Sequence, residues 1–168
     1  GITPASTAEA AMTAPFEEDG NNAAYLEARM ALATGYSEVA IDILERCRRN
    51  NPESDERIYS TLAEIYMSGN KLDKVRGILD QGKEHHPEST RLLLLNAKWF
   101  RLNGKVDDAI SILETSHTLH PGHQDIMEQL SDLYMYKIQN ARTEEQINTE
   151  IARLITLYED MVENRTGD

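Results

Sequence analysis

The histidines and the single cysteine are the residues of this sequence whose types could support metal binding or nucleophilic chemistry. The histidines form two groups, His85 with His86, and His117 with His120 and His123. His117 and His120 could share a helix face, but zinc takes three or four ligands in a tetrahedron. Both groups lie around a proline that is expected to follow a helix end, where an imidazolium ion interacts favourably with the helix dipole. We therefore expect no metal site.

No pattern in the sequence predicts catalysis or cofactor binding. Cys47 falls where a small side chain is expected to pack against a neighbouring helix, which favours a structural role over a reactive thiol. No local grouping of Ser, His and Asp, or of Cys and His, indicates an activated nucleophile. The glycines occur singly, so no phosphate-binding loop is expected. The sequence predicts a protein that is not an enzyme and carries no cofactor.

Composition and charge limit the partners. The chain has 168 residues, of which 40% are hydrophobic and 27% charged, as in globular proteins. Its formal net charge is −12, whereas nucleic-acid binding needs clustered lysine and arginine. We expect neither nucleic acid nor an anionic membrane surface as a partner, and no apolar run is long enough to insert into a bilayer. The cytoplasm and the periplasm both remain open as compartments.

The two ends of the chain differ from its middle. Residues 1–22 are mostly small and polar, with four acidic and no basic side chains, and we expect a flexible arm or linker there. The start at Gly1, with no basic segment before an apolar one, indicates a chain cut from a longer one and no secretory signal. We expect one helical domain over 23–163 and a disordered tail over 164–168.

An internal repeat organises residues 23–123. Pro52, Pro87 and Pro121 are separated by 35 and 34 residues. Before each proline the chain has one amphipathic helical stretch, a glycine and a second helical stretch; the glycines are Gly35, Gly69 and Gly104. Glycine permits a tight reversal between two helices, and proline cannot continue the second helix. Helix pairs of this kind leave an apolar face that only stacking onto a neighbouring pair can bury.

These residues resemble the tetratricopeptide repeat (TPR) family, in which aromatic, leucine, small and proline positions recur with this period. The second repeat has Tyr59, Leu62, Ala63, Tyr66, Val75, Leu79 and Pro87 at these positions. The third has Leu93, Asn96, Ala97, Phe100, Ala109, Leu113 and Pro121. The first keeps Ala28, Ala40, Leu44 and Pro52, and a divergent fourth begins with Met127, Leu130, Ser131 and Tyr134.

The resemblance implies an all-α fold, a right-handed solenoid of antiparallel helix pairs. We expect about three and a half repeats, over 21–54, 56–89, 90–123 and 124–163, the last including a C-terminal capping helix. A different solenoid of helix pairs is the rival fold.

The C-terminal segment reads as one long helix. Thr143 and Gln146 fit a capping box at its start. The following apolar residues are spaced by three and four, and form a seam of Ile147, Ile151, Leu154, Tyr158 and Met161. This seam either covers the open end of the solenoid or mediates dimerisation.

The resemblance also implies that the first helices line a concave groove that binds a peptide or helix of another protein. The residues expected there are Tyr25, Leu26, Arg29, Arg57, Thr61, Glu64, Arg91, Leu94, Leu95, Lys98 and Arg101, followed by Glu128, Asp132 and Met135. Residues 92–95 are four consecutive leucines, so we expect some of them to need a cover on the groove side. Arginine suits carboxylates, which predicts an acidic, partly apolar partner segment.

The sequence therefore predicts a protein-interaction scaffold or adaptor. The chain's own residues 16–19, Phe-Glu-Glu-Asp, have the character of the expected partner and could occupy the groove as a placeholder. The alternative is a self-associating homo-oligomeric assembly factor of a larger complex, which uses the C-terminal helix seam and could be tethered to a membrane by residues preceding Gly1.

Overall fold

The computed structural model describes residues 18–166, and this part of the chain is built from helices and short turns without a strand. Its helices form two compact units, one ending at Glu88 and the other beginning at Ser89. The sequence predicted one domain over 23–163. Compact units of this kind are expected inside a single repeat domain, because each helix pair contacts only its neighbours and two pairs already share a core.

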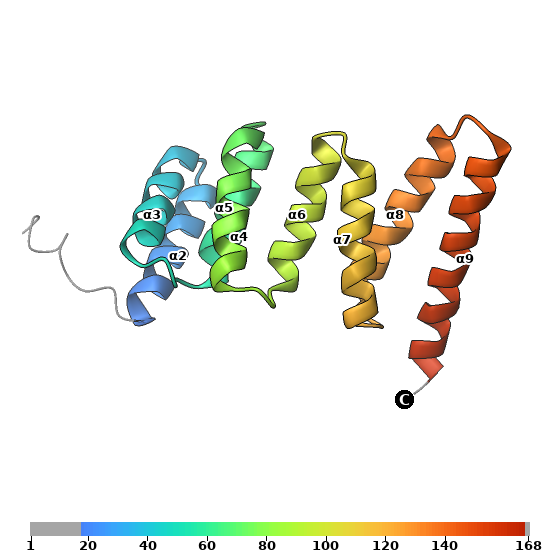
Figure 1. Cartoon of the computed structure of the whole chain (residues 1–168). Coiled ribbons are helices and arrows are strands. Elements are labelled where there is room, and N and C mark those ends of the chain that lie inside the picture. The colour runs from blue at the N-terminus through green and yellow to red at the C-terminus, as the bar shows by residue number, and fades with distance from the viewer. Residues whose placement is uncertain (1–17, 167–168) are drawn as a thin grey trace, which may run out of the picture. The chain divides into compact units, whose positions relative to one another are not determined.

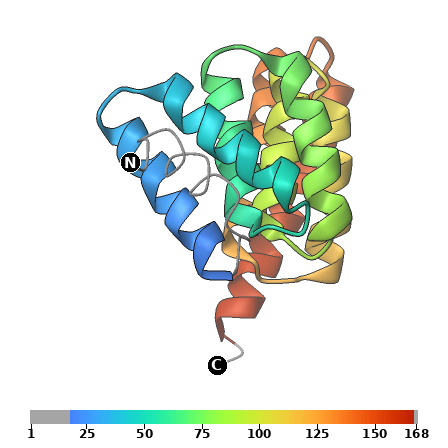
Figure 2. The same ribbon diagram turned by 90° about the vertical axis from the view of Figure 1, so that its left-hand side faces the viewer.

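Unit 1 contains two helix pairs, which Figure 1 labels α2 to α5. They are α2 (Glu18–Ala33), α3 (Ser37–Asn50), α4 (Glu56–Ser68) and α5 (Leu72–His85). α2 packs on α3 and α4 packs on α5, while α3 also packs on α4 and so joins the two pairs. α2 lies at the edge of this unit (Figure 2).

Unit 2 repeats this plan with a longer last helix. It contains α6 (Thr90–Leu102), α7 (Val106–Leu119), α8 (Gln124–Asn140) and α9 (Glu144–Thr166). α6 pairs with α7 and α8 with α9, and α7 packs on α8. All-α helix pairs of the TPR kind, as predicted, are therefore confirmed.

The small residues of the repeat are buried as expected. Ala28, Ala40, Ala63 and Ala109 are fully buried and Ala97 is 1% exposed. In unit 2, Ala97 and Ala109 belong to the core formed by the inner faces of the four helices. The repeat register read from the sequence is therefore correct.

In the first three helix pairs, the turn between the two helices contains one residue in the left-handed region. Gly35 (φ 85°) and Gly104 (φ 73°) take this conformation in the first and third pairs, where a side chain would be strained. In the second pair the residue with positive φ is Asn70 (φ 54°), not the neighbouring Gly69. Asparagine tolerates this region better than most residues.

A tyrosine near the end of a first helix bonds to a glutamate of the preceding second helix in each unit. The Tyr66 hydroxyl donates to Glu45 Oε1 at 3.2 Å, and the Tyr134 hydroxyl donates to Glu114 Oε1 at 2.8 Å. Burial, together with the negative charge of Glu114, raises the pKa of Tyr134 well above its ordinary value. The bond therefore links α7 to α8 only while the phenol keeps its proton.

Tyr134→Phe should lower the stability of unit 2 at neutral pH by about 1.5–3 kcal/mol, because it removes a hydrogen bond to a charged acceptor. A phenol whose pKa is raised by folding holds its proton more tightly in the folded state, so wild-type stability falls as pH rises above about 10. The variant should show a shallower alkaline decline. Urea unfolding at neutral and alkaline pH, with exposed Tyr136→Phe as control, measures both effects. Identical pH profiles for Tyr134→Phe and wild type would contradict this account.

Both ends of the described chain are more helical than predicted. α2 begins at Glu18, within the expected 1–22 arm, and α9 continues to Thr166, within the expected 164–168 tail. The early start of α2 is stabilised by Asn21, which is 9% exposed and accepts a hydrogen bond from the Cys47 thiol of α3 at 3.1 Å. The rest of the arm and the end of the tail lie outside the described residues, as do Phe16 and Glu17 of the suggested placeholder.

The expected capping box is present at the start of α9. The Gln146 amide donates to Thr143 Oγ1 at 3.2 Å, and the Gln146 side-chain oxygen accepts from the Arg142 amide at 2.9 Å. The reciprocal bond reaches one residue further back than in the usual box. Both bonds satisfy backbone donors around the helix start.

The apolar seam predicted on α9 only partly faces the core. Leu154 and Met161 pack against the unit 2 core. Leu157, which is 3% exposed and which the predicted seam omitted, belongs to that core. Ile151 and Tyr158 are 39% and 48% exposed. The cause is that the apolar surface of α9 is wider than one seam, and only one edge of it is covered by α8.

Within the described residues no helix combines the length and the apolar character needed to cross a membrane.

Candidate functional site

The predicted groove residues of unit 1 fall into two groups. In the first, Tyr25 of α2 is 8% exposed and lies between two arginines. Arg29 donates to its hydroxyl at 2.9 Å, and the Arg57 guanidinium lies 4.7 Å from the centre of its ring. A cation above an aromatic ring is stabilised by the negative face of the ring. Tyr25 therefore holds both arginines in place.

Arg57 also forms an ion pair with Asp55, the N-cap residue of α4. Its guanidinium donates to both carboxylate oxygens, at 2.9 and 2.7 Å. The hydrogen bond from Arg57 is the main reason why the pKa of Asp55 is lowered. Because Arg29 and Arg57 are already engaged by protein groups, a ligand carboxylate would have to compete with those groups for either arginine.

The second group in unit 1, Thr61 and Glu64, lines a hollow of about 490 Å³ between α3 and α4. Thr61 is buried and Glu64 half-buried. The charged groups at the rim include Glu38 and Lys71, which form an ion pair at 3.7 Å. This hollow offers a ligand more acidic than basic side chains.

The leucines of α6 are all covered to some degree. Leu92 and Leu95 are buried, whereas Leu93 and Leu94 are half-buried and pack against the unit 2 core. Leu95 is therefore not an open groove residue, contrary to the sequence prediction. Arg91 is exposed in the first turn of α6.

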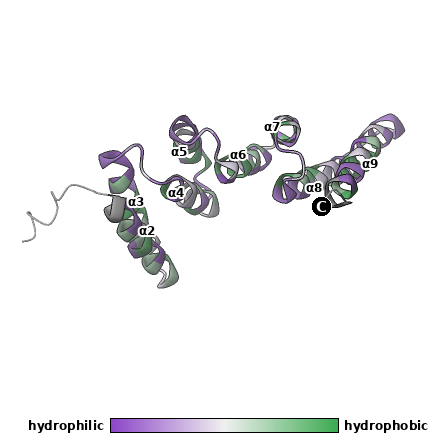
Figure 3. Cartoon of the chain, turned by 90° about the horizontal axis from the view of Figure 1, so that it is seen from below, coloured by the Kyte–Doolittle hydropathy of each residue, from purple (hydrophilic) through white to green (hydrophobic). Residues whose placement is uncertain are grey.

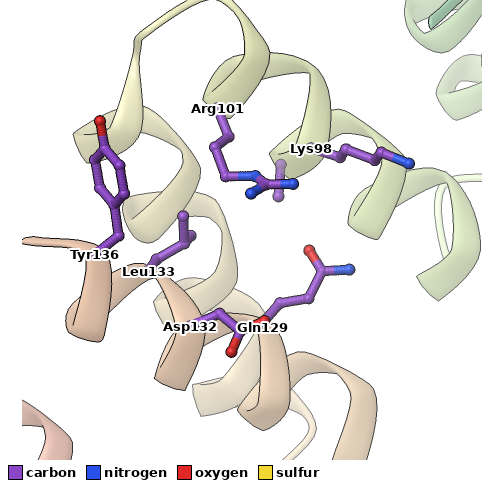
Figure 4. Close-up of a pocket in the computed structure, with 7 residues that line it drawn as sticks. Lys98, Arg101, Gln129, Asp132, Leu133 and Tyr136 are labelled. Atoms are coloured by element: carbon purple, nitrogen blue, oxygen red, sulfur yellow. The ribbon is translucent and has the colours of Figure 1, made fainter. Parts of the chain in front are cut away.

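The remaining predicted residues, Lys98 and Arg101, meet at a hollow of about 260 Å³ between the first helices α6 and α8 of unit 2. Figure 4 shows Arg101 of α6 and Gln129 of α8 extending toward each other across this hollow, with Lys98 along its edge. The residues that line the unit 2 hollow are Ala97, Lys98, Arg101, Gln129, Asp132, Leu133 and Tyr136.

The cationic side chains of the unit 2 hollow, unlike the arginines of unit 1, can bind a ligand without first releasing a protein group. Lys98 and Arg101 are exposed and one helical turn apart. Within the part of the chain that the structure describes, neither side chain forms a hydrogen bond or an ion pair. Beside them, Ala97 and Leu133 supply a buried apolar floor. The hollow therefore combines two unpaired cations with an apolar surface.

Of the three α8 residues expected in the groove, Asp132 lines this hollow, whereas Glu128 and Met135 are exposed and do not line it. Gln129, Leu133 and Tyr136 take their place. They follow Glu128, Asp132 and Met135 by one residue each. The core register of α8 is as the resemblance implied, with Met127, Leu130 and Tyr134 buried, so the difference concerns only which side of α8 lines this hollow.

The residues that could do metal or thiol chemistry have structural contacts. His86 Nε2 lies 2.7 Å from the Ser54 carbonyl oxygen, and His117 Nε2 lies 3.1 Å from Asp160 Oδ2. Among residues 18–166 no three potential metal ligands lie close together. Burial raises the pKa of Cys47, which disfavours its reactive thiolate form.

The fold and the hollow together define a TPR-like helical repeat chain with a cationic hollow between first helices. Solved structures with the same fold include TTC0263, a thermophilic TPR protein of Thermus thermophilus, with 18% identity and a TM-score of 0.59 over 86% of this chain and 77% of that one. A MamA RS-1 variant shares 10% identity with a TM-score of 0.61, over 90% and 80% of the two chains.

A third similar structure is the human IFIT1 dimer with m7Gppp-AAAA. It has 20% identity and a TM-score of 0.61, and the match covers 90% of this chain but 34% of that protein. No protein-family model matches the sequence, and no curated protein matches it either. The likeness to these structures therefore concerns the fold.

Proposed function

We propose that this chain is a protein-interaction scaffold that holds an acidic, partly apolar segment of another protein in the unit 2 hollow. The observation that carries the proposal is the pair of unpaired cations, Lys98 and Arg101, beside an apolar floor. A ligand carboxylate could form charge-assisted hydrogen bonds with the two side chains without displacing a protein partner.

The size of the hollow supports a peptide over a small molecule. A volume of about 260 Å³ lies below the range of about 300–1,000 Å³ that is usual for small-molecule sites. It accommodates one or two side chains of a longer segment. Gln129 on the opposite wall is half-buried and can bond to a peptide backbone through both its donor and its acceptor.

The chemistry of the walls also suggests an orientation for the segment. Carboxylates would face α6, because Asp132 on α8 repels them. An apolar side chain would contact Ala97, Leu133 and the ring of Tyr136. No group of the hollow is paired as nucleophile and base, so we propose binding without catalysis.

An array of unmodified peptides, acidic-apolar and basic-apolar, tests this function with purified protein. Wild type should bind acidic-apolar peptides, and Lys98→Glu/Arg101→Glu should weaken the best of them at least ~10-fold, the effect of losing about 1.4 kcal/mol. The matched control is Lys83→Glu/Lys105→Glu, which changes the net charge equally at exposed positions outside the hollow. Fluorescence anisotropy gives the affinities.

Two outcomes would contradict the proposal. One is equal binding by wild type and Lys98→Glu/Arg101→Glu. The other is binding of a short oligoadenylate RNA in preference to every peptide, which the net charge of −12 argues against. The RNA is included because one structure of the same fold contains a capped RNA.

A further inference from the structure

The outer side of α9 carries a row of large apolar side chains that face solvent. Ile151, Ile155, Tyr158 and Val162 are 39%, 52%, 48% and 61% exposed. Their spacing of four, three and four places them on one side of the helix. We call them the α9 row. Figure 3 shows apolar (green) segments along α9 as well as along α2.

The residues of α7 that correspond to the α9 row show how this fold buries such a surface. Core-facing residues of α7 have counterparts 41 positions later on α9, where Ala109, Leu113 and Ser116 correspond to Glu150, Leu154 and Leu157. All six are buried or half-buried. The same offset of 41 positions relates Ile110, Glu114 and His117 of α7 to three residues of the α9 row, Ile151, Ile155 and Tyr158.

On α7 this row is covered by the next helix pair. Ile110 is 3% exposed, Glu114 accepts the hydrogen bond from Tyr134 of α8, and His117 contacts Asp160 of α9. The α9 row is therefore the surface on which a further helix pair would stack. Within the described residues no such pair is present; the Tyr158 hydroxyl lies 3.0 Å from Ser131 Oγ of α8, but the Tyr158 side chain remains 48% exposed.

Within residues 18–166, the complementary kind of surface is exposed on α2. Its outer row consists of Ala23, Leu26, Met30 and Ala33, all exposed, with Met30 at 71%. We call them the α2 row. The equivalent residues on α4 lie 35 positions later and are Ile58, Thr61, Ile65 and Ser68. Those on α8 lie 103 positions later and are Ile126, Gln129, Leu133 and Tyr136.

Those equivalents face the preceding helix pair. Ile58 is fully buried, and Ile126 and Leu133 are 1% and 4% exposed. Thr61 and Ile65 line the hollow between α3 and α4. The α2 row is thus the surface by which a first helix packs on the pair before it.

We infer that the α9 row of one copy of this chain binds the α2 row of a second copy, head to tail. Both rows are apolar and exposed, and each has the position of a surface that this fold buries between neighbouring helix pairs. A contact between them would remove both rows from water.

Charge argues against a symmetric contact between two α9 helices. Glu159 and Glu163 are exposed beside the α9 row, and residues 124–168 carry ten acidic against four basic side chains. A symmetric pair would bring like charges together along its length. A head-to-tail contact leaves one row free at each end, so association can continue past a dimer.

Sedimentation velocity over a concentration series, with single and mixed variants, tests the contact. Wild type should gain mass with concentration beyond a dimer. Met30→Glu blocks the α2 row and Ile155→Glu blocks the α9 row, so each alone should stay monomeric. An equimolar mixture should form a dimer and stop there, because each variant keeps the row that the other needs. Both side chains are exposed, so circular dichroism should show wild-type helix content.

Each other outcome overturns the inference. A wild type that stays monomeric at every concentration excludes the contact. Dimers of Met30→Glu alone, with none from Ile155→Glu, would indicate a symmetric α9 interface. Leu119→Glu serves as control, since Leu119 is 69% exposed on α7 and belongs to neither row; it should associate like wild type. If the glutamate variants lose helix content, Met30→Ala and Ile155→Ala replace them, with weaker association expected in each.

Discussion

Replacing Ala109 with leucine is expected to lower the melting temperature of the protein by several degrees. Ala109 is fully buried on α7, in the core that joins all four helices of unit 2. Adding three carbon atoms to a close-packed contact costs about 1–3 kcal/mol. In chains of this size, 1 kcal/mol corresponds to about 2–4 °C. Thermal unfolding followed by circular dichroism measures the shift.

Two other positions make this prediction specific. Ser111→Leu adds a leucine to the exposed side of the same helix and should change stability by no more than about 0.5 kcal/mol. Ala97→Leu should fall between the two, because Ala97 is 1% exposed but borders the unit 2 hollow, into which part of the new side chain can extend. Equal melting temperatures for Ala109→Leu and Ser111→Leu would contradict the repeat register on which the fold assignment depends.

The repeat made most of this fold predictable. Helix-breaking prolines at a near-constant spacing set the helix pairs, and small residues at fixed places in each pair set the buried contacts. What the sequence could not show was which edge of a broad apolar surface faces the core. On α9 the residues at spacings of three and four include both the half-buried Leu154 and the exposed Ile151, and only the position of α8 distinguishes them.

The candidate site was less predictable than the fold. A first-helix arginine looks the same in sequence whether or not it is already engaged. Arg57 bonds to Asp55 because that carboxylate caps its own helix, whereas within the described residues the Arg101 side chain forms no ion pair, not even with Asp132 in the same hollow. The choice of unit 2 over unit 1 therefore depended on side-chain contacts. Of the α8 residues that line the hollow, only Asp132 was expected; Gln129, Leu133 and Tyr136 lie one position further along the helix than the expected residues.

A charge cluster around one buried carboxylate, which the sequence did not predict, holds α7, α8 and α9 together. Lys137 of α8 forms ion pairs of 2.8 Å with both Asp107 of α7 and Glu150 of α9. Glu150 is 5% exposed and has a second, longer contact of 3.5 Å with Arg153. Hydrogen bonds to the two carboxylates raise the pKa of Lys137. At neutral pH its positive charge is thus the main compensation for a buried carboxylate.

Lys137→Met should therefore destabilise unit 2 strongly. Removing one partner of a buried ion pair costs about 3–5 kcal/mol, because the remaining charge stays buried. We expect a value near the lower end, since the Lys137 side chain is 30% exposed and Arg153 remains close to Glu150. Urea unfolding followed by circular dichroism at neutral pH gives the free energy.

The double variant Lys137→Met/Glu150→Leu separates loss of a favourable contact from burial of an unpaired charge. If the cost of Lys137→Met comes from the stranded carboxylate, then removing that carboxylate as well should restore most of the wild-type stability, because replacing both members of a buried pair with apolar residues is often neutral or stabilising. Asp107 loses its partner in both variants, but its side chain is 85% exposed and water can solvate it. If instead the double variant is as unstable as Lys137→Met, the ion pair itself stabilises the packing of α8 against α9. If Lys137→Met unfolds like wild type, Glu150 is not a buried charge in solution.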